Sequence, residues 1–445
     1  MNYFIPSNSN LKAPLYIGLG FTLFTLIIFV FGPFDFPNFC GPILYVFLFV
    51  NYFAIYKGFT KGYQGNIVVY ENPRPFPLRK FINTLFWVSL IIALPKFLIY
   101  AHFPDLSPAA LIARASMFFT DAQELYLDKL DQASSVKGIW RVINWVIVLA
   151  SPLSWAYTII AVVFWKRLAT FQKIGTIYIW LLYALEFLLT GTNFGLFDLF
   201  ISIGVAYVAS NLRNTEKKKR IRKKGKLSGV RLFILLGALI YLLIWIFDTS
   251  MSSRIGDSFY NGGEVAGVAY GLNTNSFLWN ICPPSLRPVL TYLAYYVAKP
   301  YSALSVALTL PYEPTFGVGY SWFLLDNVPF SDFFWERTYP MRIEHIYRYS
   351  HTINWHTAYT WFANDVSFFL VPVLFFYLFR LFGRAWKEYL TTGNIGSFLL
   401  FMIYVKMMFF LSANNQVFQG SATTFAFWIL IFTRKKFRSY YYDEL

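Results

Sequence analysis

The stretch PLYIGLGFTLFTLIIFVFG, from Pro14 to Gly32, decides the fold class because it carries no charge along its whole length. A helix of about 20 apolar residues is long enough to cross roughly 30 Å of hydrocarbon. Similar runs recur through a chain that is 57% hydrophobic and 13% charged, whereas a soluble domain is about 25% charged. The sequence therefore predicts an all-α fold, that of a polytopic helical membrane protein.

About ten membrane spans are expected, the first of them Pro14–Gly32. The other nine are predicted at Gly41–Tyr56, Phe81–Tyr100, Trp140–Trp165, Ile174–Leu189, Leu196–Ala209, Leu232–Phe247, Val366–Phe382, Ser397–Leu411 and Val417–Thr433. Between the third and fourth spans, Leu106–Met117 is predicted to form a short amphipathic helix along the membrane interface.

The basic residues indicate the orientation of these spans. Most of the 38 lysines and arginines follow the second, fourth, sixth and eighth spans or lie in the tail. Cytoplasmic loops carry such an excess, so both termini are predicted to be cytoplasmic. The basic run Arg213 to Arg231 is then a cytoplasmic loop beside anionic lipid headgroups. The net charge of +16 does not favour nucleic acid, since the basic loops lack interleaved aromatics that stack bases.

This orientation divides the chain into three blocks. Residues 1–247 hold the first seven spans, residues 248–365 form one large loop on the outer face of the membrane, and residues 366–445 hold the last three spans and a basic tail. Within the loop, the apolar stretch Val289–Leu310 is interrupted by Lys299 and Pro300. We therefore expect a helix–turn–helix on the outer surface in place of a further span.

Two other groups of residues bear on the predicted structure. Cys40 and Cys282 both fall on the outer side, where a disulfide and two unrelated thiols are both compatible with the sequence. Charged residues within the spans are costly in lipid, so they are expected to face the interior of the bundle and to pair. These are Lys96, Arg141, Glu186, Asp198 and Lys406.

The outer block carries the residues that indicate chemistry. Its five arginines are Arg254, Arg287, Arg337, Arg342 and Arg348. Because a guanidinium group binds phosphate oxygens in pairs and stays charged, this cluster predicts a site for a lipid diphosphate headgroup. The alternative is that these are surface charges paired with Asp332, Glu336 and Glu344.

Three of the four histidines lie in the same block, at His345, His351 and His356. A histidine or a carboxylate beside the arginines can serve as a general base toward a hydroxyl group. The spacing of the histidines does not match a helical pair of zinc ligands at i and i+4. No metal and no cofactor are therefore expected.

Several motifs between Tyr301 and Val417 resemble those of bacterial oligosaccharide repeat-unit polymerases, the O-antigen (Wzy-type) polymerases. The resemblance rests on the run from Tyr301 through Pro311, together with Thr315–Gly319, Tyr339–Glu344, Asn354-Trp355, Trp361–Phe368 and Ala413–Val417. The residues before the outer block match that family only in forming apolar spans. The chain departs from the pattern at Asn193, where many relatives have arginine, and the histidines are not part of it.

The resemblance implies a glycosyltransferase of the bacterial inner membrane that acts at the periplasmic face. Such enzymes join oligosaccharide repeat units carried on undecaprenyl diphosphate into a surface polysaccharide, and a protein that regulates chain length is an implied partner. By this resemblance Arg342 would steady the diphosphate, with Tyr301 in the same site. Glu344 and Asp365 would be acid or base groups, and His356 is a further catalytic candidate. The rival functions are an O-antigen ligase and a transporter or flippase of lipid-linked oligosaccharide.

Overall fold

The computed structural model describes residues 12–67, 74–102, 104–132, 138–218, 237, 241, 244–254, 256, 261–437 and 440–441. The chain forms two compact units, Met1–Phe76 with Ser258–Leu445, and Pro77–Asp257. The first unit thus joins the two N-terminal helices to the C-terminal part of the chain, a grouping that cuts across the three sequence blocks. The predicted span Leu232–Phe247 and the basic run Arg213 to Arg231 lie mostly outside the described residues.

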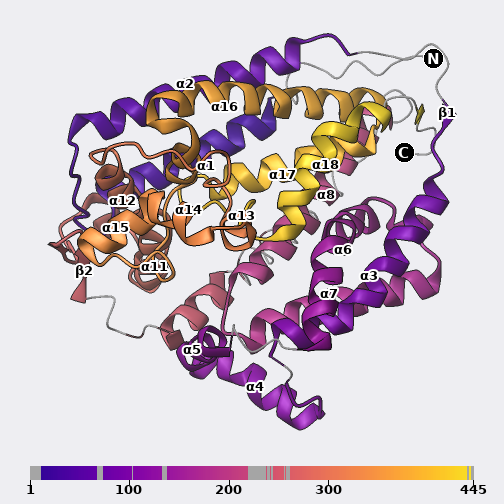
Figure 1. The fold of residues 1–445 in the computed structure, drawn as a ribbon, viewed down its shortest axis with the longest axis horizontal. Helices are drawn as coiled ribbons and strands as arrows, with labels where there is room; N and C mark the ends of the chain where they lie inside the picture. The colour runs from indigo at the N-terminus through magenta and orange to yellow at the C-terminus, as the bar shows by residue number, and fades with distance from the viewer. Residues whose placement is uncertain are drawn as a thin grey trace. The chain divides into compact units, whose positions relative to one another are not determined.

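Within the described part of the chain, the first unit contains most of the helices and four short strands (Figure 1). Its strands pair in parallel as β1 (Arg74–Pro75) with β4 (Tyr440–Tyr441), and as the antiparallel hairpin β2 (Gly263–Val265) with β3 (Val268–Tyr270). Its helices are α1 (Ala13–Phe31), α2 (Pro42–Gln64), α10 (Phe277–Ile281), α11 (Arg287–Val297), α12 (Lys299–Ala307), α13 (Trp322–Asn327), α14 (Ser331–Arg337), α15 (Tyr339–Tyr347), α16 (Ala358–Thr392), α17 (Ile395–Phe410) and α18 (Ser421–Phe437).

The second unit is built from longer helices. They are α3 (Leu78–Tyr100), α4 (Pro108–Thr120), α5 (Ala122–Gln132), α6 (Ile139–Val163), α7 (Thr170–Leu189) and α8 (Phe194–Lys218). Helix α3 packs against both α6 and α7. Helix α4 occupies the position of the predicted interfacial segment, and its first turn is capped by the Ser107 side chain, which accepts a hydrogen bond from Ala110 N.

Among the described residues, seven helices are long and apolar enough to cross a membrane: α1, α2, α3, α6, α7, α8 through Arg213, and α16. The structure is therefore that of an all-α protein with several candidate spans, as a polytopic membrane protein requires. The predicted number of about ten spans is not reached within this part of the chain. Helix α17 is apolar but has 16 residues, and α18 has 17.

Helices α2 and α16 lie side by side (Figure 1), and their backbones pack closely against each other. Gly58 and Gly62 of α2 face the backbone of α16, since a methyl group added to Gly62 would lie 1.9 Å from the carbonyl oxygen of Arg380. Gly383 of α16 faces Phe59 in the same way. Small residues spaced four apart allow such close packing of helices in membranes.

Helix α16 is bent near its start. Ser367 has φ 61° and ψ 159°, which is not a helical conformation. Pro372 follows one turn later, and a proline inside a helix removes an N–H donor and crowds the carbonyl four residues before it. The bend separates a buried first segment, Ala358 to Asn364, from the long apolar segment that packs on α2.

The structure corrects two expectations and confirms a third. The stretch Val289–Leu310 does form two helices that meet at Lys299, but all nine residues of α12 are buried, so this helix is not on the surface. Arg141 is exposed and does not face an interior. Lys96 pairs with Glu186 as predicted, with Nζ 3.0 Å from Oε2. Cys40 and Cys282 are free thiols.

Candidate functional site

The site of interest is built on Asn364 and Asp365, at the end of the first segment of α16. Asn364 accepts a hydrogen bond from Tyr339 N at the start of α15 and donates one to Gly319 O. Its own carbonyl oxygen accepts from Thr315 N at 3.1 Å. One asparagine therefore fixes both α15 and the loop of residues 311–320, which we call the outer loop.

Asp365 completes the anchoring of the outer loop. Its Oδ1 accepts hydrogen bonds from Thr315 Oγ1 at 2.5 Å, Gly317 N at 2.8 Å and Gly319 N at 3.1 Å, and its Oδ2 accepts from Tyr320 N at 2.8 Å. Gly317 has φ 89°, a conformation that favours glycine. Because both oxygens accept hydrogen bonds from the outer loop, Asp365 acts as a structural anchor of that loop.

Two of the predicted arginines converge on the outer loop. Arg342 of α15 donates from Nη1 to Pro311 O at 2.7 Å, and its Nε lies 3.3 Å from Oε1 of Glu313. Arg337 of α14 donates to Pro314 O at 3.5 Å. Nη2 of Arg342 makes no hydrogen bond to another described residue. The two guanidinium groups therefore border the same four-residue segment from different helices.

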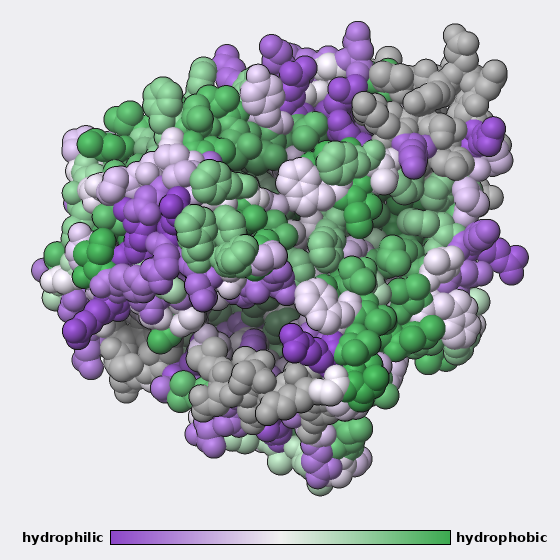
Figure 2. Space-filling view, in the orientation of Figure 1, coloured by the Kyte–Doolittle hydropathy of each residue, from purple (hydrophilic) through white to green (hydrophobic). Residues whose placement is uncertain are grey.

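A polar, exposed surface surrounds this pair. His345, one turn along α15 from Arg342, lies 3.2 Å from Oε2 of Glu336, and the side chains of this His–Glu pair are 52% and 57% exposed. Figure 2 shows hydrophilic residues gathered over the part of the first unit where Figure 1 places α14 and α15. Glu313 adds a carboxylate whose side chain is 45% exposed. We call Glu313, Glu336, Arg337, Arg342 and His345 the polar face.

Glu344 lies on another side of α15, because residues two apart on a helix point in different directions. Its Oε2 contacts the ring of His351 and accepts from His351 N at 2.8 Å. Burial raises the pKa of the Glu344 carboxyl group, but these hydrogen bonds and the charge of the imidazole outweigh it, so that the pKa is lowered. The structure thus separates Glu344 from Arg342.

The His351 ring lies in an aromatic cluster. Its centroid is 5.2 Å from that of Trp322 and 5.0 Å from that of Trp335, and Trp361 packs on both tryptophans. The Trp335 indole donates to Oδ1 of Asp326 at 3.0 Å. This cluster holds α13, α14 and the start of α16 together. Glu344 and His351 therefore stabilise the helices that carry the polar face.

Two predicted site residues are buried. His356 is 1% exposed, and its ring nitrogens have no hydrogen-bond partner among the described residues. Burial lowers the pKa of His356 to about 3. Tyr301 is 0% exposed, and its hydroxyl lies 3.0 Å from Thr25 Oγ1 of α1. Neither side chain presents a surface to a headgroup.

The three remaining arginines have different surroundings. Arg348 is exposed at the C-terminal end of α15, with φ 56°. Arg287 begins α11, where its guanidinium carbon lies 5.0 Å from the ring centroid of Trp279. Arg254 belongs to the second unit and stacks on Tyr126, with Cζ 3.9 Å from the ring centroid.

Sequence reasoning missed Glu313 and a buried lysine. Glu313 stands in the outer loop between Pro311 and Pro314, and nothing in the sequence pattern indicated its contact with Arg342. Lys299 is 6% exposed and donates to Asn354 Oδ1 at 2.8 Å and to Tyr295 Oη at 3.0 Å. Burial lowers the pKa of Lys299 to about 7. Its signal in the sequence was a lysine inside an apolar stretch.

Two of the motifs that carry the sequence resemblance, Trp361–Phe368 and Ala413–Val417, contact each other and the end of the outer loop. The Asn415 side chain donates to Tyr320 O at 2.7 Å, and Trp361 donates to Asn414 Oδ1 at 3.1 Å. No group of three or more histidine, cysteine, aspartate or glutamate side chains suited to a metal ion occurs among the described residues. No family model, curated protein or solved structure matches the chain. The class of protein supported is therefore an all-α protein with apolar helices of membrane-spanning length.

Proposed function

We propose that the chain is a membrane glycosyltransferase that polymerises oligosaccharide repeat units carried on undecaprenyl diphosphate, at the periplasmic face of the bacterial inner membrane. The observation that carries the proposal is the convergence of Arg337 and Arg342 on the outer loop beside the exposed carboxylate of Glu313. The sequence motifs that resemble O-antigen polymerases supply the substrate class. They lie on the elements that hold this face.

In the proposed reaction, a hydroxyl oxygen of the acceptor sugar forms a bond to the anomeric carbon of the donor glycan. The bond between that carbon and the diphosphate oxygen breaks, and undecaprenyl diphosphate leaves. Arg342 and Arg337 stabilise the charge that develops on the diphosphate, since preorganised donors act most strongly where charge appears in the transition state.

The proton of the acceptor hydroxyl passes to a carboxylate of the polar face. Glu313 is assigned this role because its side chain is 45% exposed and already lies beside Arg342. When a diphosphate takes the place of Glu313 on the guanidinium group, the carboxylate is released next to the reacting hydroxyl. Asp365 and Glu344 position the loop and the helix, and Tyr301 and His356 support the core.

The test is chain extension by full-length protein in membranes supplied with lipid-linked repeat units. Arg342→Ala should reduce the formation of long glycan by at least about 100-fold, a loss typical of a removed transition-state donor. Arg348→Ala, a change at the exposed residue that follows the same helix, is the matched control and should retain extension. Normal long glycan from Arg342→Ala at normal protein levels would reject the assignment. Deleting the gene separates a polymerase from a ligase. Loss of a polymerase replaces the ladder of long glycans by a lipid core that carries one repeat unit, whereas loss of a ligase leaves the core uncapped.

A further inference from the structure

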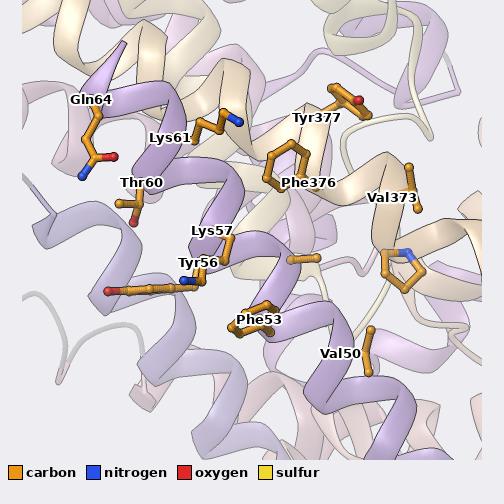
Figure 3. Close-up of a pocket in the computed structure, with 12 residues that line it drawn as sticks. Val50, Phe53, Tyr56, Lys57, Thr60, Lys61, Gln64, Val373, Phe376 and Tyr377 are labelled. Atoms are coloured by element: carbon orange, nitrogen blue, oxygen red, sulfur yellow. The ribbon is translucent and has the colours of Figure 1, made fainter.

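A groove runs along the contact between α2 and α16 in the first unit. It has a volume of about 830 Å³ and is lined by residues of both helices. Figure 3 shows its labelled side chains on two neighbouring helices, with Lys61 of α2 extending toward the side of α16 that carries Phe376 and Tyr377. The groove belongs neither to the polar face nor to the network around Asp365.

The lining of the groove changes character along α2. One end is apolar and exposed, with Val50 at 43%, Phe53 at 55% and Val373 of α16 at 52%. The other end is basic, with exposed Lys57 and Lys61 followed by Gln64. Lys57 Nζ lies 5.2 Å from the ring centroid of Phe53, at the boundary between the two ends. No carboxylate lines the groove, and neither lysine forms an ion pair within the described residues.

A second observation concerns an unused donor. Thr60 lines the same basic end, and its hydroxyl is buried without a hydrogen-bond partner among the described residues. A third cation is close by, since Nζ of Lys12, the residue before α1, lies 5.6 Å from the ring centroid of Tyr56, which also lines the groove. Two lysines and a nearby third cation therefore gather at the basic end of the groove.

From this arrangement we propose that the α2–α16 groove is a binding site for an anionic glycerophospholipid. The phosphate lies between Lys57 and Lys61, and an acyl chain follows Val50, Phe53 and Val373. The charge pattern predicts that this end of α2 faces the cytoplasm, where basic residues attract anionic headgroups. The apolar end continues toward the depth of the bilayer.

The close crossing of the helices gives the bound lipid a structural role. Gly58 and Gly62 hold α2 against the backbone of α16, and the groove borders that contact. A lipid held by residues of both helices would stabilise their packing by binding only the assembled form.

The experiment measures binding of phosphatidylglycerol to the purified full-length chain in detergent, by native mass spectrometry and by the shift in apparent Tm. The double variant K57Q/K61Q should weaken binding roughly 30-fold, from about 1 kcal/mol for each lysine near a headgroup. The matched control K80Q/K166Q removes two exposed lysines outside the groove and should bind as the unchanged protein does. Equal loss in both variants would overturn the proposal.

Three further arms identify the occupant. Phosphatidylcholine, which has no net charge, should bind much more weakly than phosphatidylglycerol, and equal binding would overturn charge recognition. Val373→Trp fills the apolar end and should reduce binding while both lysines remain. Displacement by inorganic phosphate alone, or preference for undecaprenyl phosphate, would overturn the assignment to a glycerophospholipid.

Discussion

Each unit contains a lysine in apolar surroundings, and the two regions stabilise it differently. In the second unit, Lys96 of α3 pairs with Glu186 of α7 at 3.0 Å, beside the ring of Tyr183. In the first unit, Lys299 of α12 contacts Asn354 and the Tyr295 hydroxyl, and it has no carboxylate partner within the described residues. The rings of Tyr270, Tyr295 and Tyr349 lie around its ammonium group.

The difference follows from what each position allows. Lys96 lies within a helix of membrane-spanning length, where an unpaired charge is costly and a carboxylate partner is the expected solution. Lys299 lies in the predicted outer segment, where neutral dipoles and aromatic faces partly replace water. Burial then lowers the pKa of Lys299 to about 7, so this amine can lose its proton in place of gaining a counter-charge.

The largest effect is expected at the carboxylate that organises the first unit. Asp365→Ala leaves one hydroxyl and three backbone N–H donors of the outer loop without an acceptor. We expect a loss of about 4 kcal/mol in the free energy of unfolding, since an unsatisfied donor costs roughly 1–3 kcal/mol when buried and these four donors are partly buried or exposed. Thermal unfolding in detergent measures it. A variant with unchanged Tm and lost glycan extension would instead show that Asp365 contacts substrate.

A smaller effect is expected in the second unit. Glu186→Gln leaves Lys96 without its counter-charge, and breaking a buried pair costs about 3 kcal/mol. The double variant Lys96→Met with Glu186→Gln removes the stranded charge and should recover most of that loss. Circular dichroism during heating reports both. If the double variant is as unstable as the single one, the ion pair is not the reason for the loss, and the contrast with Lys299 fails.

The smallest effect is a dependence of stability on pH at Lys299. Its pKa is about 7 in the folded protein against a usual 10.5, so between these values the unfolded chain binds more protons. Stability should therefore rise with pH from 7 to 9, by at most about 1.4 kcal/mol per pH unit. Lys299→Met should flatten that slope, whereas Lys80→Met, at an exposed lysine, should not. The same slope in all three proteins would contradict a neutralised Lys299.

The apolar helices could be predicted closely because their signal is local. The predicted spans at Pro14–Gly32 and Phe81–Tyr100 agree with α1 and α3 to within a few residues. Length and hydropathy suffice for a helix in lipid, where every backbone group must be bonded within the helix itself. The pairing of Lys96 with Glu186 also followed from the cost of an unpaired charge.

The candidate site could be predicted only in part. The motifs placed Arg342 and Asp365 in one segment, but they did not predict the different roles of these two residues. Asp365 and Thr315 are 50 positions apart, and no periodicity in the sequence indicates that they meet. Arg254 and Arg287 looked equivalent to Arg342 by residue type alone. Their stacking on Tyr126 and Trp279 depends on which helix each one joins.

The sequence by itself determined an all-α chain of apolar, membrane-length helices, because composition and run length act within single segments. Only the tertiary structure decided that α12 is buried, that Asp365 is an anchor, and that Arg337 and Arg342 border the same loop beside Glu313. It also decided that Lys57 and Lys61 end an apolar groove on α2 and α16. These properties depend on contacts between distant segments, and the energy of such contacts is set by burial and geometry that no single segment contains.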